Sequence, residues 1–464
     1  MTHKKLRILL ISVHGLIRAS APELGKDPDT GGQVLYVLEL AKALSRHSGV
    51  ACVELLTRLI NDPALDRDYA QPVEVINPKA RILRMPCGPQ GYIRKERLWN
   101  HLDQLVEAYL GLLRQGAQRP DVIHSHYGDA GYVAMRLSKI LGIPFIHSAH
   151  SLGRYKRATM LAAGGDEKEL DRIFNFSRRI EVEEEVLEKA SLVIASTGQE
   201  LIEQYSTYDH FDELKSQVIP PGTDLTRFFP PGRDKSFQGV AENADRFFQA
   251  PGKPLLISIG RAAPRKNLLG LVQAFGADAE LRRMANLVII AGNREEIRGL
   301  DDTSSQAWES ILFAIDQYDL YGHIAIPKNH TPDQIPNFYR LAYSRKGLCV
   351  NPSISETFGL TLIEAAATGL PLIATDQGGP KDILNHCQNG LLVDTRDPAA
   401  MAQAIKVALS DPGQWRTWSR NGLRGVRKYY AWDVHADSYI KFVTTFCGRR
   451  TERRQGNRIT SCRP

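Results

Sequence analysis

The feature that most constrains this chain is the alternation of short apolar runs with amphipathic segments of helix length. Several runs are rich in β-branched residues and apolar at successive positions, which is typical of parallel strands covered by helices on both faces. We therefore predict an α/β fold with doubly wound parallel sheets. The strands are expected at residues 7–13, 52–57, 81–85, 122–125, 144–148, 192–196 and 217–219, and at residues 255–259, 287–291, 324–327, 348–351, 372–375 and 391–393.

A break rich in proline and glycine near residues 230–254 divides the pattern into two halves of domain size. We predict two Rossmann-like domains, at residues 1–240 and 250–428, that face each other across a central cleft. A helix at residues 429–447 follows the second sheet and is expected to return to the first domain. Residues 448–464 are expected to form a basic, disordered tail.

The net charge of +7 comes mainly from that tail, where six arginines and one glutamate contribute +5. No aromatic residue stands among these arginines as a stacking platform, so nucleic-acid binding is not expected. The six cysteines are scattered and form no C-x-x-C pair, which argues against a zinc cluster or a disulfide framework. No apolar run is long enough to span a bilayer, and the first strand begins too soon after Met1 for a signal peptide. We therefore expect a cytoplasmic protein with no membrane partner.

Two glutamates bracket the start of a predicted helix after the run at residues 348–351. Glu356 falls in the loop, Gly359 lies near the helix start, and Glu364 lies about one turn inside the helix. The unpaired N–H groups and the positive dipole end of a helix start can hold an anion. The stretch therefore fits a ligand that carries both phosphate and hydroxyl groups. The alternative is a surface loop with an acid that caps the helix.

Further residues follow the carboxyl ends of predicted strands, where ligands bind in open α/β sheets. Arg261 ends one strand and Lys266 begins the next helix, so the two could clamp a diphosphate; the alternative is a pair of solvated cations. Gly31 and Gly32 precede another helix and let the backbone approach a phosphate or sugar, unless they form a plain turn. Residues 378–379 are a similar glycine pair in the second half. Because neither pattern is G-x-G-x-x-G, dinucleotide binding is not expected.

Histidines and basic residues gather after the strands of the first half. The H-x-H pattern of His124 and His126 places both rings on one face, but no third ligand is matched to them, so a metal site is not expected. His150, at a strand end, fits better as a hydrogen-bonding group. The basic residues that precede helices in this half include Lys95, Lys156, Arg178 and Arg179. Each alone would be an exposed charge, but together they would form a pocket for a phosphate dianion.

In combination these stretches resemble the retaining glycosyltransferases of the GT-B fold. The resemblance rests on Asp29-Thr30-Gly31-Gly32-Gln33, on His150-Ser151-Leu152-Gly153, on Arg261 with Lys266-Asn267, and on Glu356 with Glu364. In detail, the stretches at residues 291–294, 315–322, 327–330 and 358–367 are similar to those of the sucrose-phosphate synthase family. The resemblance runs from about residue 6 to residue 445, and the order and number of the motifs make it specific.

The resemblance implies transfer of glucose from UDP-glucose to fructose 6-phosphate with retention at the anomeric carbon, giving sucrose 6-phosphate and UDP. The catalytic residues that it implies are Arg261, Lys266, His150 and Glu356. The donor-binding residues that it implies are Gly32, Arg261, Lys266, Glu356, Gly359, Leu360, Thr361 and Glu364. The acceptor-binding residues that it implies are Gly31, Gly32, Gln33, Lys95, Tyr127, His150, Ser151, Lys156, Arg178 and Arg179. Which of the two adjacent arginines holds the phosphate stays open.

In such a reaction the leaving UDP can accept the proton, so the protein needs cations on the diphosphate and no nucleophilic carboxylate. We therefore expect no metal and no cofactor beyond the substrate UDP-glucose. The sequence ends before any phosphatase-like domain, so a separate sucrose-phosphate phosphatase is expected to act on the product.

Three other functions remain open at this stage. The first two are sucrose synthase and a mannosylfructose-phosphate synthase-like enzyme. The identity of the donor is open because no residue of the sequence identifies the nucleobase unambiguously. The basic residues Lys95, Lys156 and Arg178 favour a phosphorylated acceptor over free fructose. The third is a non-catalytic protein that binds nucleotide sugars, and the complete set of acids and cations argues against it.

Overall fold

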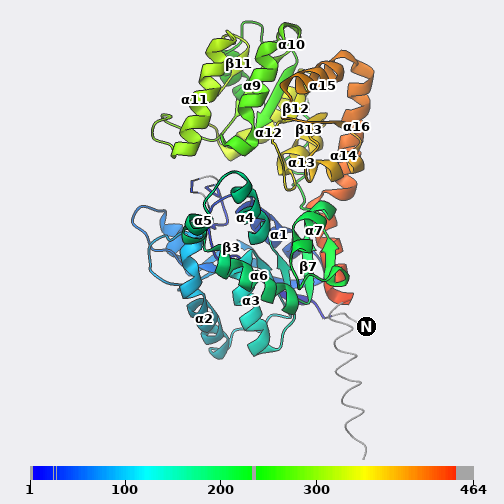
Figure 1. Ribbon diagram of the computed structural model, residues 1–464. Helices are drawn as coiled ribbons and strands as arrows, with labels where there is room; N and C mark the ends of the chain where they lie inside the picture. The colour runs from blue at the N-terminus through cyan, green and yellow to red at the C-terminus, as the bar shows by residue number, and fades with distance from the viewer. Residues whose placement is uncertain (1–3, 24–25, 28, 233–236, 446–464) are drawn as a thin grey trace, which may run out of the picture. The chain divides into compact units, whose positions relative to one another are not determined.

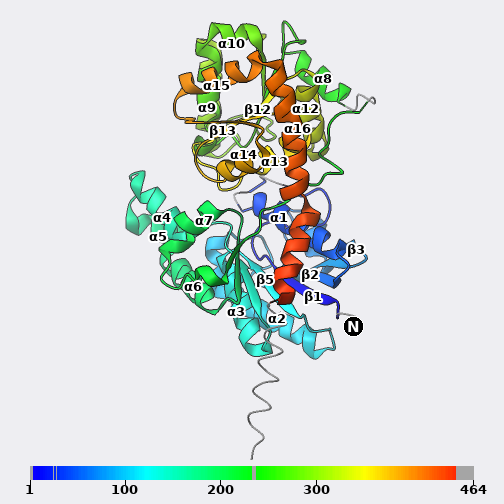
Figure 2. The same cartoon turned by 90° about the vertical axis from the view of Figure 1, so that its right-hand side faces the viewer.

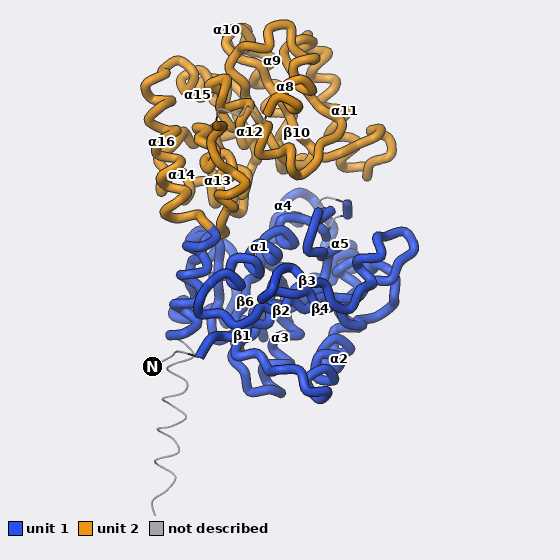
Figure 3. The backbone as a smooth tube through the Cα atoms, turned by 180° about the vertical axis from the view of Figure 1, so that it is seen from behind, with its two compact units in different colours: residues 1–220, 432–464 blue, residues 221–431 orange. Residues whose placement is uncertain are grey.

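The computed structural model describes residues 4–23, 26–27, 29–232 and 237–445 (Figure 1). The chain forms two compact units, one of residues 1–220 with 432–464 and one of residues 221–431 (Figure 3). The tail predicted at residues 448–464 lies outside the described residues. Among the residues described, no helix combines the length and the apolar character needed to cross a membrane.

The first unit is built on an eight-stranded sheet with the strand order β3-β4-β2-β1-β5-β6-β7-β8. The strands are β1 (Leu6–Ile11), β2 (Val50–Arg58), β3 (Val73–Asn77), β4 (Ala80–Met85), β5 (Val122–His126), β6 (Phe145–Ser148), β7 (Leu192–Ala195) and β8 (Ser216–Val218). Neighbouring strands are parallel except β3, which is antiparallel to β4. The helices are α1 (Gly32–Arg46), α2 (Leu102–Arg114), α3 (Gly128–Leu141), α4 (Gly153–Ala162), α5 (Glu167–Phe174), α6 (Phe176–Lys189) and α7 (Gly198–Glu203), with the 3-10 helices η1 (Arg67–Ala70), η2 (Lys95–His101), η3 (Tyr205–Thr207) and η4 (Glu213–Lys215).

Helices bury both faces of this sheet. Leu9 and Ile11 of β1 belong to a core with α2, α3 and α6, whereas Ile8 and Leu10 belong to a core with α1. This division follows from the strand geometry, in which successive side chains point to opposite faces. A helix at residues 432–445 lies along the α1 side of the sheet and adds Trp432 to that core (Figure 2).

The second unit is built on a six-stranded, fully parallel sheet with the order β11-β10-β9-β12-β13-β14. The strands are β9 (Leu255–Ile259), β10 (Asn286–Ile290), β11 (Ile324–Ala325), β12 (Leu348–Asn351), β13 (Leu372–Thr375) and β14 (Gly390–Val393). The helices are α8 (Gln238–Asp245), α9 (Leu268–Ala277), α10 (Ala279–Met284), α11 (Asp302–Gln317), α12 (Ile335–Ser344), α13 (Leu360–Ala367), α14 (Pro380–Cys387), α15 (Pro398–Ser410) and α16 (Pro412–Tyr429), with η5 (Pro264–Lys266) and η6 (Pro332–Gln334). Leu255 and Ile257 of β9 pack with α12 and α13, and Leu256 packs with α9, α11 and α15 on the other face.

The predicted fold class is confirmed, since each unit is a largely parallel sheet wound with helices on both faces. The first unit ends at residue 220, earlier than the expected end at residue 240. The reason is tertiary packing: Phe228, Val240 and Phe248 lie in the core of the second unit. The polar stretch predicted as a domain boundary therefore belongs to the opening segment of the second unit.

Candidate functional site

In the second unit, the loop between β12 and α13 holds Glu356 close to the start of a helix. The Ser353 N–H donates to Asn351 Oδ1 at 3.1 Å, and the Ser353 hydroxyl donates to Glu356 at 3.3 Å. Gly359 precedes α13 with φ of +104°, a left-handed conformation that suits a residue without a Cβ atom. The loop position of Glu356 and the helical position of Glu364 are as the sequence predicts.

Glu356 forms an ion pair with Lys266, a residue 90 positions away in the chain. Burial alone would raise the pKa of Glu356, but Lys266 and Arg265 outweigh burial and hold the pKa below its ordinary value. Arg265 also fixes the loop, because its guanidinium donates to the Ser355 carbonyl at 2.9 Å. Glu356 is therefore an ionised, hydrogen-bond-accepting group at neutral pH.

Arg261 follows β9 and is exposed. Within the described part of the chain, its guanidinium has no hydrogen-bond or ion-pair partner. Lys266, by contrast, ends η5 and is already turned toward Glu356. The structure thus joins Lys266 to the loop and leaves the Arg261 charge in solvent.

The glycine pair at residues 378–379 packs against the backbone of the loop that carries Glu356. The Gly379 N–H donates to the Glu356 carbonyl at 2.9 Å, and the Glu356 N–H donates to the Gln377 carbonyl at 3.2 Å. A Cβ atom on Gly378, whose φ is +92°, would lie 2.1 Å from the Glu356 carbonyl oxygen. This pair therefore serves close packing of two backbones, which differs from the ligand approach expected at Gly31 and Gly32.

Glu364 is half-buried in α13 and receives a hydrogen bond from the Tyr339 hydroxyl at 3.4 Å. The same hydroxyl reaches the Thr361 carbonyl at 3.2 Å. Burial raises the pKa of Glu364 to about 7, although Arg227 and the Tyr339 hydrogen bond act in the opposite direction. This carboxyl is poised between its neutral and charged forms near neutral pH.

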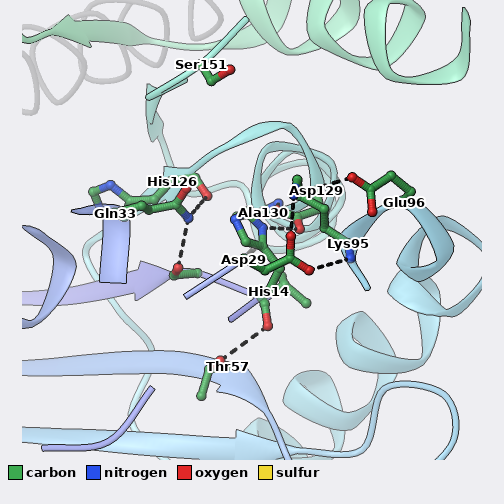
Figure 4. A network of polar contacts seen from close by, with 12 residues as sticks. His14, Asp29, Gln33, Thr57, Lys95, Glu96, His126, Asp129, Ala130 and Ser151 are labelled. Carbon is green, nitrogen blue, oxygen red and sulfur yellow. Dashed lines mark hydrogen bonds and ion pairs between the residues drawn. The ribbon is translucent and has the colours of Figure 1, made fainter. Parts of the chain in front are cut away.

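In the first unit, the entrance of α1 is open. A Cβ atom built on either Gly31 or Gly32 would meet no atom of the described residues within 4 Å. The next residue, Gln33, donates from its amide nitrogen to Ser12 Oγ at 3.1 Å and to the His126 carbonyl at 3.3 Å (Figure 4). Both amide hydrogens are thereby used, so the Gln33 carbonyl oxygen is the end that can accept a further hydrogen bond.

Several histidines of this unit are buried around the ends of β5 and β6. His126 Nδ1 and His150 Nε2 lie 2.9 Å apart, and His14 Nδ1 lies 2.7 Å from Asp129. Burial lowers the pKa of His126 well below its ordinary value, and it lowers the pKa of His150 to about 3. These two rings are therefore neutral at neutral pH. Among the described residues, no group of three or more histidine, cysteine or acidic side chains is arranged to hold a metal ion.

Lys95 is held by Asp29, the first residue of a motif named above, to which the sequence assigned no role of its own. Its ammonium forms an ion pair with Asp29, and its backbone N–H donates to Asp29 at 3.0 Å (Figure 4). The Tyr92 hydroxyl donates to the same carboxylate at 2.9 Å. Burial works against these contacts, but Lys95 outweighs it and the pKa of Asp29 stays below its ordinary value.

Lys156 and Arg179 lie in one small pocket with Lys95. The residues that line the pocket are Lys95, Glu96, Trp99, Tyr127, Lys156, Phe174 and Arg179. Arg179 is buried and paired with Glu183 at 2.8 Å, whereas Lys156 has no carboxylate partner within the described residues and lies 4.3 Å from the centre of the Phe174 ring. Burial, Lys95 and Arg179 together lower the pKa of Lys156 to about 8.

The other predicted acceptor residues lie around this pocket. The Arg179 guanidinium lies 4.4 Å from the centre of the Tyr127 ring and donates to the Ser151 carbonyl at 2.7 Å. Arg178 is not among the lining residues; it donates to Asn100 Oδ1 at 2.8 Å and to the Trp99 carbonyl at 3.4 Å. Of the adjacent pair, Arg179 is the one that faces the pocket.

Sequence reasoning did not predict which carboxylates and which hydroxyl hold these groups. Asp29, Glu183, Asp129 and Tyr339 each contact a predicted site residue or its neighbour. One signal was readable: Arg179 and Glu183 are four residues apart on one helix, a spacing that brings side chains together. The pairing of Asp29 with Lys95 had no such signal, because 66 residues separate them.

Two family models match the chain. The model described as "Glycosyltransferase Family 4" matches residues 30–227, and that described as "Glycosyl transferases group 1" matches residues 241–424. The chain is 40% identical to the probable sucrose-phosphate synthase 1 of Oryza sativa subsp. indica, over 94% of this chain and 46% of that protein. It is 41% identical to the probable sucrose-phosphate synthase 2 of Arabidopsis thaliana, over 96% of this chain and 48% of that protein.

A solved sucrose-phosphate synthase from Thermosynechococcus elongatus superposes with a TM-score of 0.75 at 27% identity, covering 96% of this chain and 100% of that one. The chain is a homologue of sucrose-phosphate synthases over nearly its whole length. It spans about half the length of the curated relatives that it matches. A glycosyltransferase-like fold is also shared with the Anabaena protein HepE solved with UDP-glucose, with a TM-score of 0.64 at 16% identity over 95% of this chain and 100% of that one. The GT-B fold predicted from the sequence is confirmed.

Proposed function

We propose that this chain transfers glucose from UDP-glucose to fructose 6-phosphate with retention at the anomeric carbon. Its relatives among the sucrose-phosphate synthases support this reaction over nearly the whole length of the chain. The observation that carries the proposal is the pocket shared by Lys95, Lys156 and Arg179. Lys95 and Arg179 are paired with carboxylates, but Lys156 has no carboxylate partner among the described residues, and its unpaired charge suits a phosphorylated acceptor better than free fructose.

On the acceptor side, Lys156 is the main phosphate ligand, because its charge is the one not neutralised by a carboxylate. Lys95 and Arg179 complete the pocket, and Tyr127 and Ser151 line the path from the phosphate to the sugar. A phosphate dianion stabilises the protonated form of Lys156, so binding raises its pKa from the value of about 8. Gly31, Gly32 and Gln33 approach the reacting sugars, since the α1 entrance has open space for a ligand. Arg178 lies outside the lining of this pocket, and its contact with the acceptor stays a prediction.

On the donor side, Arg261 and Lys266 hold the diphosphate together with the N–H groups of Gly359, Leu360 and Thr361 at the start of α13. Glu356 accepts hydrogen bonds from the glucose hydroxyls, and Glu364 binds the ribose hydroxyls. His150 contacts the glucose that is transferred. The structure supports these roles, because Glu356 is ionised and His150 is neutral at neutral pH. Arg261 has no partner among the described residues and is free to bind the diphosphate.

In the reaction, the bond from the anomeric carbon to the UDP oxygen breaks and a bond to the 2-hydroxyl oxygen of fructose 6-phosphate forms on the same face. The hydroxyl proton passes to the departing phosphate oxygen, so no protein base is consumed. Arg261 and Lys266 stabilise the charge that develops on the diphosphate, which is the largest expected contribution to catalysis. Since these cations supply that charge, the proposal needs no metal and no cofactor other than the sugar nucleotide.

The product keeps its phosphate, so a separate sucrose-phosphate phosphatase is the expected next enzyme. We propose the cytoplasm as the compartment, where both substrates are soluble metabolites. No nucleic acid or membrane takes part in the proposed reaction.

The deciding experiment offers the protein UDP-, ADP- and GDP-sugars with either fructose or fructose 6-phosphate, and identifies products by mass and by the anomeric coupling constant. We expect α-linked sucrose 6-phosphate from UDP-glucose, with unchanged rates in excess chelator. Arg261→Ala and Lys266→Ala should each lower turnover by roughly 10²–10³.

Other outcomes would point to specific alternatives. Sucrose from free fructose would indicate a sucrose synthase, and a product from GDP-mannose would indicate a mannosylfructose-phosphate synthase-like enzyme. Binding of UDP-glucose without any product would indicate a non-catalytic protein.

A further inference from the structure

His126 and His150 form a directly bonded pair of imidazoles at the end of the first sheet. His126 is the last residue of β5, and His150 follows β6 in a left-handed backbone conformation with φ of +55°. His126 Nδ1 lies 2.9 Å from His150 Nε2, and the rings stack with centroids 5.2 Å apart. The Tyr36 ring packs edge-on against both, with its centroid 5.7 Å from that of His126 and 4.8 Å from that of His150. The geometry allows one hydrogen bond between the two rings, donated by one of them.

The environment of His126 decides which ring donates. Its second nitrogen, Nε2, is buried and has no hydrogen-bond partner among the described residues. A proton on Nε2 would leave a buried N–H donor unsatisfied, at a cost of roughly 1–3 kcal/mol. A bare lone pair at the same position costs less, since unsatisfied acceptors are tolerated better than unsatisfied donors. The proton of His126 therefore resides on Nδ1 and is donated to His150.

This assignment fixes the tautomer of His150. Its Nε2 accepts from His126 and so carries no hydrogen. Burial keeps both rings neutral, because it lowers the pKa of each below its ordinary value. A neutral imidazole has one N–H, which in His150 must then be at Nδ1.

We infer that His126 is a positioning residue that holds His150 in the Nδ1–H tautomer, so that His150 presents a hydrogen-bond donor to a sugar oxygen. The role of His150 toward the sugar rests on the proposed function, whereas the tautomer itself does not. His126 also orients Gln33, because the Gln33 amide nitrogen donates to the His126 carbonyl at 3.3 Å. His126 thus sets a donor at His150 with its ring and an acceptor at the Gln33 oxygen with its backbone.

The first test reads the tautomer directly. Protein labelled with ¹⁵N in its histidine rings is measured by long-range proton–nitrogen NMR, and the His150 signals are assigned by their loss in His150→Gln. We expect His150 with a protonated Nδ1 and a bare Nε2 in the wild-type protein. A wild-type His150 protonated at Nε2 would overturn the inference, whatever the variants do.

The second test removes the donor. His126→Leu should shift His150 toward the Nε2–H tautomer and lower kcat/KM by roughly 10- to 100-fold, the usual effect of losing a group that orients a histidine. His126→Asn, whose amide nitrogen stands near the position of Nδ1, should restore most of the tautomer and of the activity. Unchanged His150 signals and unchanged kcat/KM in His126→Leu would contradict the inference.

His147→Leu is the matched control. His147 is also buried in a strand, but its ring bonds Ser125 Oγ at 3.0 Å and makes no hydrogen bond to His150. Loss of this ring should lower stability while leaving the His150 tautomer as in wild type. If His150 shows the expected tautomer but no glucose is transferred, the proposed function fails and the positioning role within the pair stands.

Discussion

At the scale of single residues, the proposed role of the Lys156 charge in phosphate binding can be tested directly. Its pKa is lowered to about 8 by burial, Lys95 and Arg179, and in the described residues no carboxylate pairs with it. Lys156→Met should therefore raise the KM for fructose 6-phosphate by roughly 10- to 100-fold, the worth of one hydrogen bond between charged groups, with a smaller change in kcat. Steady-state kinetics measures both constants.

The neighbouring Arg157 is a suitable control for that prediction. It is paired with Glu167 on the outside of α4, so Arg157→Gln should leave the KM for fructose 6-phosphate unchanged. In the wild-type protein the same KM should rise above about pH 8, as Lys156 loses its proton. A KM unaffected by Lys156→Met would exclude Lys156 as the phosphate ligand.

Glu364 predicts a second pH effect, on the donor side. Burial raises its pKa to about 7, so much of it is protonated at pH 6 and most of it is ionised at pH 8. If ribose hydroxyls bind its charged form, binding lowers this pKa and releases a proton, and UDP affinity must rise with pH across this range. Calorimetric titration of wild type and Glu364→Gln separates this effect from the titration of UDP itself. Parallel pH profiles for the two proteins would rule out a charged Glu364 in binding.

At the scale of elements, the sequence was most informative where a strand is buried on both faces. Leu255–Ile259 and Leu348–Asn351 have the predicted bounds, because continuous apolar runs between helices leave little freedom. β3 was missed because it is an antiparallel edge strand whose Val73 and Val75 are 51% and 69% exposed. An edge strand has one neighbouring strand and a largely exposed surface, so its sequence lacks the apolar run from which the buried strands were predicted.

The site shows the same division between local and distant causes. The loop position of Glu356 and the helical position of Glu364 followed from local pattern, as did the glycines at the α1 entrance. The ion pair of Lys266 with Glu356 and that of Lys95 with Asp29 join residues 90 and 66 positions apart. Such pairings depend on how strands are ordered in a sheet, which composition and spacing alone do not determine.

The two glycine pairs predict opposite outcomes for the same substitution. Gly378 has a φ of +92°, and in Gly378→Ala the new Cβ would clash with the Glu356 carbonyl. The free energy of unfolding should therefore fall by at least about 2 kcal/mol. In Gly32→Ala, the new Cβ meets no atom of the described part of the chain within 4 Å, and it stands at the first residue of α1, where alanine is the better helix former.

We therefore expect Gly32→Ala to unfold at or above the wild-type temperature, yet to lose roughly 100-fold in kcat/KM because its methyl group displaces the sugar. Gly378→Ala should melt roughly 4–8 °C lower. Calorimetry with kinetics on both variants checks this pair of outcomes. Full activity in Gly32→Ala would show that no substrate approaches the α1 entrance.

At the scale of the whole molecule, the buried histidines predict unequal acid stability of the two units. In the first unit, burial lowers the pKa of His124, His126, His147, His150 and His435. In the second unit, His323 and His330 also have lowered pKa values. The first unit therefore carries the larger proton-linked penalty.

The sign follows from proton binding. An unfolded histidine titrates near its ordinary pKa of 6.5, whereas the folded His147 and His435 titrate at about 3 and about 4. The unfolded chain thus binds more protons below pH 6.5, and folding stability is lost as the pH falls from there toward the folded pKa. At pH 5.5, one unit below the ordinary pKa, each such histidine lowers the free energy of unfolding by roughly 1 kcal/mol. Glu200, whose pKa burial raises to about 7, works in the opposite direction but is a single carboxyl of this kind among the described residues of the unit.

Several histidines together therefore remove a large share of the stability of an ordinary domain, which is roughly 5–15 kcal/mol. On acidification from pH 7.5 to 5.5, the first unit should unfold while the second remains folded. Hydrogen exchange read by mass spectrometry distinguishes them, since peptides from β5 and β6 should lose protection before peptides from β9 and β12. His147→Gln, which removes one titrating group, should shift the midpoint of this loss to lower pH, and loss of protection in β9 and β12 first would contradict the assignment of the penalty to the histidines.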